Sequence, residues 1–225
     1  MIDQQSIVKR KKVLTLPDGG GCEGVRLVLH ACCAPCSAAV VEKLLAEGAR
    51  PLVFFSNANI VPMEEYVHRR QELERLLTAW EVPYAEDAYD HAAWLRHIKG
   101  LEHEPERGRR CAACFLFRLR RTALFAQEQG IGWIATTLAS SRWKDLNQVN
   151  AAGMAAVEGV PGVSFWANNW RKGGLQERRG KLIKEMGFYN QRYCGCEFSL
   201  CAGTSQGSCE APKGDSVTRC NTAPL

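Results

Sequence analysis

Short apolar runs that alternate with longer amphipathic segments constrain the fold of this chain most. A run rich in valine and leucine covers residues 25–31, and a helical pattern follows over residues 37–47. The same periodicities predict further strands at 51–55, 82–85, 133–137 and 163–166 and further helices at 64–80, 88–99, 113–128, 145–158 and 175–186. Such alternation is typical of βαβ units with right-handed crossovers. We therefore predict a single Rossmann-like or HUP-like α/β domain with a mostly parallel sheet flanked by helices.

The composition divides the chain into three regions. Residues 1–22 are basic and then glycine-rich, which is typical of a flexible N-terminal arm. Residues 202–225 are rich in Gly, Ser, Thr and Pro and predict a disordered tail. Residues 23–201 between them form the expected α/β domain. The apolar run at residues 13–16 is too short for a secretory signal, so we expect none. No apolar run reaches about 18 residues, and we expect a cytoplasmic protein that does not contact a membrane.

Cysteine is the unusual component of this sequence. The chain has 11 cysteines, and an odd number in a cytosolic chain argues against a disulfide framework, because the cytosol keeps thiols reduced. Metal ligation and thiol redox chemistry are favoured by three clusters, which are Cys32-Cys33-Ala34-Pro35-Cys36, Cys111-Ala112-Ala113-Cys114 and Cys194-Gly195-Cys196. Inert packing is the better explanation for the isolated cysteines, which are Cys22, Cys201, Cys209 and Cys220.

The first two clusters are candidates for one metal centre. Cys32 and Cys33 follow the first predicted strand, at the sheet edge where parallel α/β domains bind ligands. Cys36 falls near a helix N-terminus, where the helix dipole favours a thiolate. Cys111 and Cys114 begin a later helix at a spacing that lets both sulfurs reach one metal. Four thiolates suit either a structural Zn²⁺ or a [4Fe–4S] cluster, and their position at this edge favours the cluster.

The third cluster, Cys194-Gly195-Cys196, has a different geometry. A disulfide across one residue closes a small strained ring, and strained disulfides are the labile, catalytic ones. Gly195 supplies the backbone freedom that such a ring needs. Two further ligands for the metal centre are the alternative to a redox pair, and we favour the redox pair.

Basic residues are distributed unevenly along the chain. Residues 107–121 contain six arginines and no acidic residue. This pattern suits a polyanionic partner such as nucleic acid, in which the arginines contact phosphates, or it marks a solvated surface.

Three further positions have two interpretations each. His30 is a ligand or proton donor, or a structural histidine at the end of a strand. Asp145 coordinates a metal or donates a proton, or it caps the helix that follows. Residues 57–62 bind substrate through side-chain amides, or they form a turn.

Six groups of residues, in order along the chain, carry a family resemblance. They are His30-Ala31-Cys32-Cys33-Ala34-Pro35-Cys36-Ser37; Asn57-Ala58-Asn59-Ile60 with Glu65-Tyr66 and Arg69; Arg110-Cys111-Ala112-Ala113-Cys114-Phe115 with Arg118-Leu119; Thr136-Thr137-Leu138 with Lys144-Asp145; Lys172-Gly173-Gly174; and Tyr193-Cys194-Gly195-Cys196 with Phe198-Ser199. Each motif is weak by itself, and together they are specific. Over residues 25–200 the chain resembles the cobalamin-independent, iron–sulfur epoxyqueuosine reductase family.

The resemblance implies an oxidoreductase of tRNA queuosine biosynthesis. Its substrate is tRNA that carries epoxyqueuosine at the wobble position, and its product is queuosine. Residues 23–201 are then the catalytic domain with an iron–sulfur site. The resemblance further implies that a [4Fe–4S] cluster is bound by Cys32, Cys33, Cys111 and Cys114. It makes Cys194 and Cys196 the redox-active disulfide. Cys36 falls outside this ligand set and is an alternate ligand, for one additional iron. The resemblance does not identify the electron donor.

Two alternatives come from other classes of protein. An ATP-pyrophosphatase-like tRNA-modifying enzyme has a similar α/β architecture, but the first strand-to-helix turn here carries cysteines in place of a glycine-rich phosphate cradle. A non-catalytic zinc protein that binds RNA is the second alternative. Elemental analysis distinguishes the two, because the reductase should contain iron and sulfide and the alternative should contain zinc.

Overall fold

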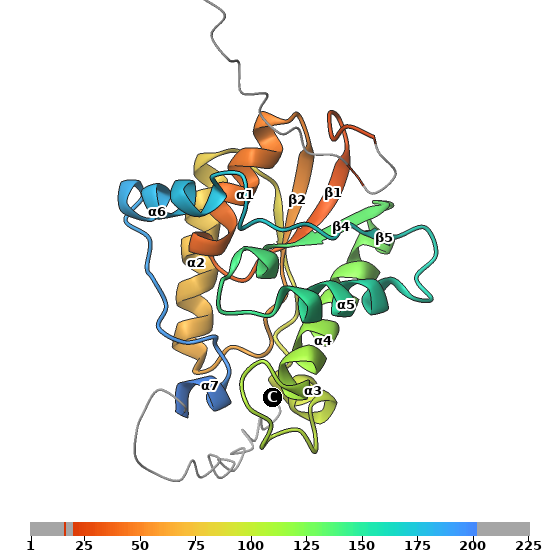
Figure 1. The fold of residues 1–225 in the computed structure, drawn as a ribbon, viewed down its shortest axis with the longest axis vertical. Coiled ribbons are helices and arrows are strands. Elements are labelled where there is room, and N and C mark those ends of the chain that lie inside the picture. Colours follow the sequence, from red (N-terminus) through yellow and green to blue (C-terminus); the bar gives the residue numbers. More distant parts are fainter. Residues whose placement is uncertain (1–15, 17–19, 202–225) are drawn as a thin grey trace, which may run out of the picture.

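Five parallel strands form the central sheet, in the order β3-β2-β1-β4-β5 (Figure 1). The computed structural model describes Leu16 and residues 20–201. The strands are β1 (Arg26–His30), β2 (Arg50–Phe55), β3 (Tyr84–Glu86), β4 (Trp133–Thr136) and β5 (Ser164–Phe165). The predicted α/β class is thereby confirmed, and every pairing in the described sheet is parallel.

Helices connect the strands and cover both sides of the sheet. They are α1 (Ala34–Ala46), α2 (Met63–Ala79), α3 (His91–His97), α4 (Arg109–Glu128), α5 (Leu146–Val157), α6 (Leu175–Glu185) and α7 (Glu197–Cys201), with a 3-10 helix η1 (Thr137–Ser140). Helix α1 packs against α2 and α6, whereas α4 packs against α5 on the other side of the strands (Figure 1). The sequence patterns did not predict η1 and α7.

The strand order reverses direction between β1 and β4. From β1 the chain moves outward to β2 and β3, then returns to place β4 on the other side of β1. In open parallel sheets the crevice at such a reversal is where ligands bind, at the carboxyl ends of the strands. In Figure 1 these ends face downward, toward α3 and α7.

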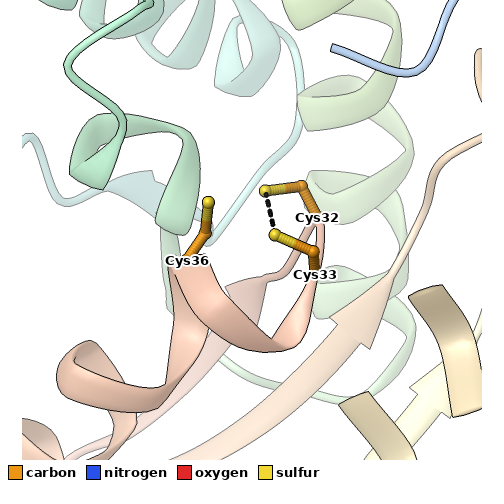
Figure 2. Close-up of side chains that lie close together, drawn as sticks. All are labelled: Cys32, Cys33 and Cys36. Carbon is orange, nitrogen blue, oxygen red and sulfur yellow. Dashed lines mark hydrogen bonds between the residues drawn. The ribbon is translucent and has the colours of Figure 1, made fainter. Parts of the chain in front are cut away.

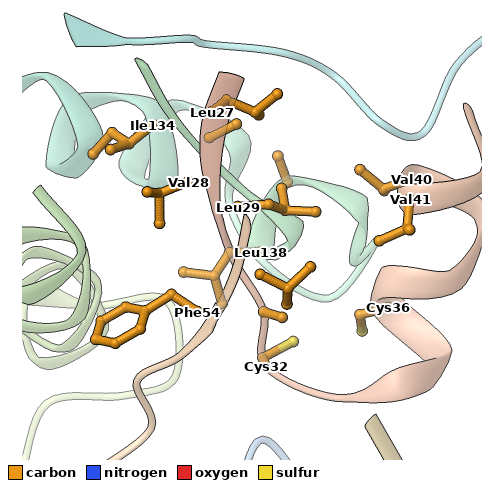
Figure 3. Close-up of a cluster of buried hydrophobic side chains, with 14 of the residues drawn as sticks. Leu27, Val28, Leu29, Cys32, Cys36, Val40, Val41, Phe54, Ile134 and Leu138 are labelled. Carbon is orange, nitrogen blue, oxygen red and sulfur yellow. The ribbon is translucent and has the colours of Figure 1, made fainter. Parts of the chain in front are cut away.

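Strand β1 lies in the core of the domain, which explains its nearly continuous run of apolar residues. Leu27, Val28 and Leu29 are fully buried, as expected for a central strand that is covered on both faces. Successive side chains alternate between these faces: Leu29 points toward Val40 and Val41 of α1, and Val28 points the other way (Figure 3). Packing of β1 in the core therefore fixes the position of Cys32 and Cys33, which follow the end of this strand.

The predicted N-terminal arm and C-terminal tail are only partly covered by the described residues. Leu16 and Cys22 are buried in the core, so inert packing is confirmed for Cys22. The predicted tail over 202–225, most of the predicted arm over 1–22 and the side chains of Cys201, Cys209 and Cys220 lie outside the described residues. Among the helices that the structure describes, none combines the length and apolar character needed to cross a bilayer.

Candidate active site

The site begins where β1 and β4 end side by side. The Cys32 backbone N–H donates to Thr137 Oγ1 at 3.4 Å, which ties the end of β1 to η1. His30 is fully buried between these segments, with Nε2 at 3.1 Å from the Ser56 carbonyl and Nδ1 at 2.9 Å from Thr136 Oγ1. Burial lowers the pKa of His30 to about 3, so the ring is a neutral link between strand ends. This geometry favours the structural interpretation of His30.

Three cysteine sulfurs lie together at the start of α1. The Sγ atoms of Cys32, Cys33 and Cys36 all lie within 4.8 Å of one another, and those of Cys32 and Cys33 are 3.8 Å apart (Figure 2). Cys33 is the N-cap of α1, and Pro35 occupies its first turn, where a missing N–H is tolerated. The turn expected from Ala34-Pro35 therefore brings both adjacent cysteines to one place.

Among these three cysteines, Cys32 is the one whose pKa is lowered. Hydrogen bonds from Cys33 and Cys36 hold the pKa of Cys32 well below its ordinary value. The hydrogen bond to Cys32 raises the pKa of Cys36 to about 11. This corrects the expectation that Cys36 is the thiolate: its neighbours outweigh the dipole of α1.

A cavity of about 770 Å³ lies next to these cysteines, and Cys32 and Cys36 belong to its lining. Six cysteines from three separate segments line it: Cys32, Cys36, Cys111, Cys114, Cys194 and Cys196. Cys33 does not line the cavity, but its sulfur accepts a hydrogen bond of 2.8 Å from Nε2 of Gln191, which does. The three cysteine clusters of the sequence therefore meet at one site.

Cys111 and Cys114 project from the first two turns of α4, as the sequence predicted. Cys114 is buried and Cys111 is half-buried. Burial is the main reason that the pKa of each thiol is raised. A metal centre that takes up these ligands as thiolates therefore releases protons when it forms.

The loop that carries Cys194 and Cys196 is held by its backbone. The Val61 N–H donates to the Gly195 carbonyl at 2.9 Å, and Arg69 Nη1 donates to the Cys194 carbonyl at 2.9 Å. Gly195 has a φ of 128°, and a Cβ there would lie 3.0 Å from Ile60 Cγ1 and 3.1 Å from Arg69 Nη1. Both flanking cysteines are free thiols in this structure, and burial raises the pKa of Cys196 to about 11.

The lining of the cavity is strongly cationic. Eight arginine and lysine side chains and two carboxylates contribute to it. Burial by itself lowers the pKa of Lys144, but the thiols of Cys194 and Cys32 in their anionic form raise it overall. Lys144 therefore keeps a positive charge beside the sulfurs, and the site favours anions.

The structure corrects the role expected for part of the arginine-rich segment. Arg118 is 2% exposed and donates to the Ser56 carbonyl and to Asn57 Oδ1. Arg120 donates to the Ala156 carbonyl at 2.9 Å, and Arg121 is paired with Asp87. These three side chains have partners within the fold and are not available as a row of phosphate contacts. The exposed arginines at the cavity are Arg107, Arg142 and Arg192.

The remaining candidates divide between structural and cavity-facing positions. Asp145 caps α5, because its Oδ1 accepts from the N–H groups of Asn147 and Gln148, and it also lines the cavity. Asn57 stabilises a turn by donating to the Ala31 carbonyl at 2.9 Å. Asn59 lines the cavity, and its buried Oδ1 has no hydrogen-bond partner among the described residues.

Sequence reasoning missed two residues of this site. Gln191 contacts the cysteines from a loop without periodicity, and no local pattern identifies it. Trp143 is 70% exposed and lines the cavity. A tryptophan in a polar loop was the signal available for it.

Comparison with known proteins shows the family of this chain. A family model described as epoxyqueuosine reductase QueH matches residues 27–202. Proteins named epoxyqueuosine reductase QueH are 43% identical over 187 residues in Histophilus somni (83% of this chain and 75% of that protein) and 42% identical over 190 residues in Haemophilus influenzae (84% and 76%). One from Thermotoga maritima is 35% identical over 178 residues (77% and 90%). The chain is thus an oxidoreductase. It belongs to the epoxyqueuosine reductase QueH family.

Proposed function

We propose that this chain reduces epoxyqueuosine at the wobble position of tRNA to queuosine. The observation that carries the proposal is the meeting of six cysteines from three segments around one cationic cavity. The strand order with its reversal between β1 and β4 supports a Rossmann-like or HUP-like catalytic domain over residues 23–201. A cavity of about 770 Å³ has the size expected for a site that encloses one modified nucleoside.

The reaction consumes two electrons and two protons. Both carbon–oxygen bonds of the epoxide break, a carbon–carbon double bond forms, and the oxygen leaves as water. The thiols of Cys194 and Cys196 supply both electrons and both protons when they join in a disulfide. An external electron donor then reopens this disulfide with two electrons and two protons.

Four cysteines form the proposed ligand set of a [4Fe–4S] cluster: Cys32, Cys33, Cys111 and Cys114. Their chemistry fits this group, because soft thiolates are its usual ligands and the pKa of Cys32 already favours the thiolate. The cationic lining offsets the negative charge of such a centre. When bound, a cluster supplies single-electron transfer and an iron that acts as a Lewis acid.

Cys36 is the alternate ligand of this proposal. Its sulfur lies within 4.8 Å of those of Cys32 and Cys33. The thiol is therefore placed to ligate one additional iron or to replace a member of the set. Metal content of single variants distinguishes these roles.

The chain's own residues bind and orient the substrate. Lys144 holds positive charge beside the cysteine thiols and stabilises their thiolate forms. The Asn59 Oδ1 atom, which lacks a partner, offers an acceptor for a hydroxyl of the modified nucleoside. Exposed Arg107 and Arg192 extend the positive surface outward, where phosphates of the anticodon loop lie in this arrangement.

Anaerobic purification tests the metal centre. Wild-type protein should contain about four irons and four sulfides, with broad charge-transfer absorbance. Cys32→Ala, Cys33→Ala, Cys111→Ala and Cys114→Ala should each lose this absorbance, and Cys22→Ala, in the core, is the matched control. Full cluster content in all four variants contradicts the ligand set, and zinc without sulfide supports a zinc-dependent RNA-binding protein instead.

Reduction of epoxyqueuosine in tRNA, followed by nucleoside mass spectrometry, tests the activity.

A further inference from the structure

The most exposed large apolar side chain of the described residues lies at the cavity. Trp143 is 70% exposed, and its side chain contributes to the lining that also contains the cysteines. Single exposed apolar side chains are common on protein surfaces, but this one lies at a cavity that is lined by cysteines and basic residues. Its indole is therefore available to a ligand that approaches the cavity.

The backbone that carries Trp143 is fixed on both sides. Arg107 Nε donates to the Trp143 carbonyl at 2.9 Å, and Arg171 Nη2 donates to the next carbonyl, that of Lys144, at 2.7 Å. One residue further on, Asp145 caps α5. An exposed ring on a backbone held at three successive residues is preorganised, so binding to it loses little conformational freedom.

The indole also has a cationic neighbour. The Arg142 guanidinium lies 5.0 Å from the centroid of the Trp143 ring. Most of the side chain remains in contact with solvent despite this neighbour. An aromatic ring beside an exposed arginine is the combination that binds unpaired nucleotides, because the ring stacks on a base and the cation contacts a phosphate.

We propose that Trp143 and Arg142 form a stacking platform for an unpaired base of the RNA substrate, next to the nucleotide in the cavity. The inference rests on the proposed function, since it takes the anticodon loop as the ligand. It goes beyond that function by assigning where the flanking nucleotide binds. The exposed arginines at the cavity, Arg107, Arg142 and Arg192, favour RNA over an apolar partner surface, because they offer positive charge to its phosphates.

Binding of anticodon stem-loop RNA tests the platform without chemistry. The full chain, purified anaerobically, is titrated with labelled unmodified stem-loop at constant salt, and fluorescence anisotropy gives the affinity. Trp143→Ala should weaken binding about five- to hundredfold, the range for loss of one stacked base, and Trp143→Phe should retain most of the affinity. Met154→Ala, which removes another exposed apolar side chain outside the cavity lining, should leave binding unchanged.

A second set of RNAs identifies the contact as stacking. Stem-loops with an abasic nucleotide on the 5′ or the 3′ side of the wobble position should bind wild type more weakly at one of these two positions. The same abasic RNA should bind Trp143→Ala no more weakly than intact RNA does, because the interaction is already absent. Equal weakening of both proteins by the abasic RNA, or unchanged affinity in Trp143→Ala, overturns the proposal.

Steady-state kinetics separate this proposal from the proposed function. If wild type reduces epoxyqueuosine in tRNA and Trp143→Ala keeps the KM for tRNA, the platform is wrong and the function stands. If the abasic experiment succeeds but no reduction occurs, the function is wrong and the platform stands. If Trp143→Ala slows only reduction by a protein donor, and not by dithionite, this surface binds the donor instead and the platform is overturned.

Discussion

Arg69 binds the backbone of the candidate redox loop at Cys194. Its Nη1 donates to the Cys194 carbonyl at 2.9 Å and its Nη2 to the Tyr193 carbonyl at 3.1 Å, across more than a hundred residues of sequence. The guanidinium is 2% exposed and is paired with Glu65 at 2.6 Å. A buried planar fork that makes two parallel contacts restricts both the position and the orientation of the loop.

Replacing this fork by a point charge should free the loop. Arg69→Lys keeps the charge beside Glu65 but loses the paired contacts to the Tyr193 and Cys194 carbonyls, so the thiols of Cys194 and Cys196 should react faster with a thiol reagent. Turnover should fall about 10- to 100-fold, because the reacting groups are misplaced. Iron content should not change. Arg70→Lys, at a surface ion pair with Glu86, is the control and should behave as wild type. Unchanged thiol reactivity in Arg69→Lys would show that the fork does not position the loop.

Gly195 should not accept a side chain. Gly195→Ala combines a φ of 128° with close contacts to Ile60 and Arg69, so the loop must move. We expect a loss of about 1–3 kcal/mol in the free energy of unfolding, measured by denaturant titration. Gly180→Ala in α6 has open space and should be neutral or stabilise by about 0.5–1 kcal/mol. Equal stability of the two variants contradicts the tight fit of the loop.

Variants of the proposed redox pair, unlike variants of the proposed metal ligands, should keep their metal. Cys194→Ser and Cys196→Ser should keep iron and charge-transfer absorbance and lose turnover, because one thiol cannot form the intramolecular disulfide. In wild type, a single turnover without reductant should remove two thiols, and peptide mapping should find the new bond between residues 194 and 196. Loss of iron in the serine variants would instead make these cysteines metal ligands, which is the alternative raised by the sequence.

The segment after the redox loop should loosen as the pH rises. The hydrogen bond that His91 Nε2 donates to Glu197 raises the pKa of His91 above its ordinary value of 6.5, and Nε2 lies 3.4 Å from Glu197 Oε1. Because the folded pKa is the higher one, this stabilisation is fully present below pH 6.5 and is lost as the pH rises through the raised pKa. The protection factors of the α7 amides, which are corrected for the intrinsic rise of exchange with pH, should therefore fall across that window.

NMR titration of His91 provides the check. Glu197→Gln should lower the His91 pKa and remove the pH dependence of the protection factors in α7, whereas Glu177→Gln, at an exposed position in α6, should change neither. A pH profile of exchange in α7 that is the same in wild type and Glu197→Gln would show that another group holds the helix.

Salt dependence should identify which arginines contact RNA. Affinity for tRNA should fall steeply with salt, because arginine–phosphate contacts release counterions. Arg192→Gln should reduce the slope of log affinity against log salt by about 1, because this side chain is exposed at the cavity. Arg118→Gln should leave the slope unchanged and lower stability, since Arg118 is buried and bonded to Ser56 and Asn57. A reduced slope in Arg118→Gln with an unchanged slope in Arg192→Gln would contradict the assignment of the exposed arginines as the phosphate contacts.

The sequence by itself determined the class of fold and the chemical type of the site. Short buried runs such as residues 27–31 have the length of a strand and are too short for a typical helix. Their alternation with helical segments predicts a parallel α/β sheet. The spacing of Cys111 and Cys114 placed both at the start of one helix, which the structure bears out. These inferences succeed because periodicity and helix ends depend on neighbours in the chain.

Only the tertiary structure decided which side chains meet and which have other partners. Cys32 and Cys194 are separated by most of the chain, and they line one cavity because the sheet reverses at β1 and the Arg69 fork holds the later loop. Local composition grouped Arg118 with the other arginines of residues 107–121, but in the fold its side chain is buried and donates to the Ser56 carbonyl, just after β2. The physical reason is that burial and hydrogen-bond partners depend on segments distant in sequence, and no local pattern contains them.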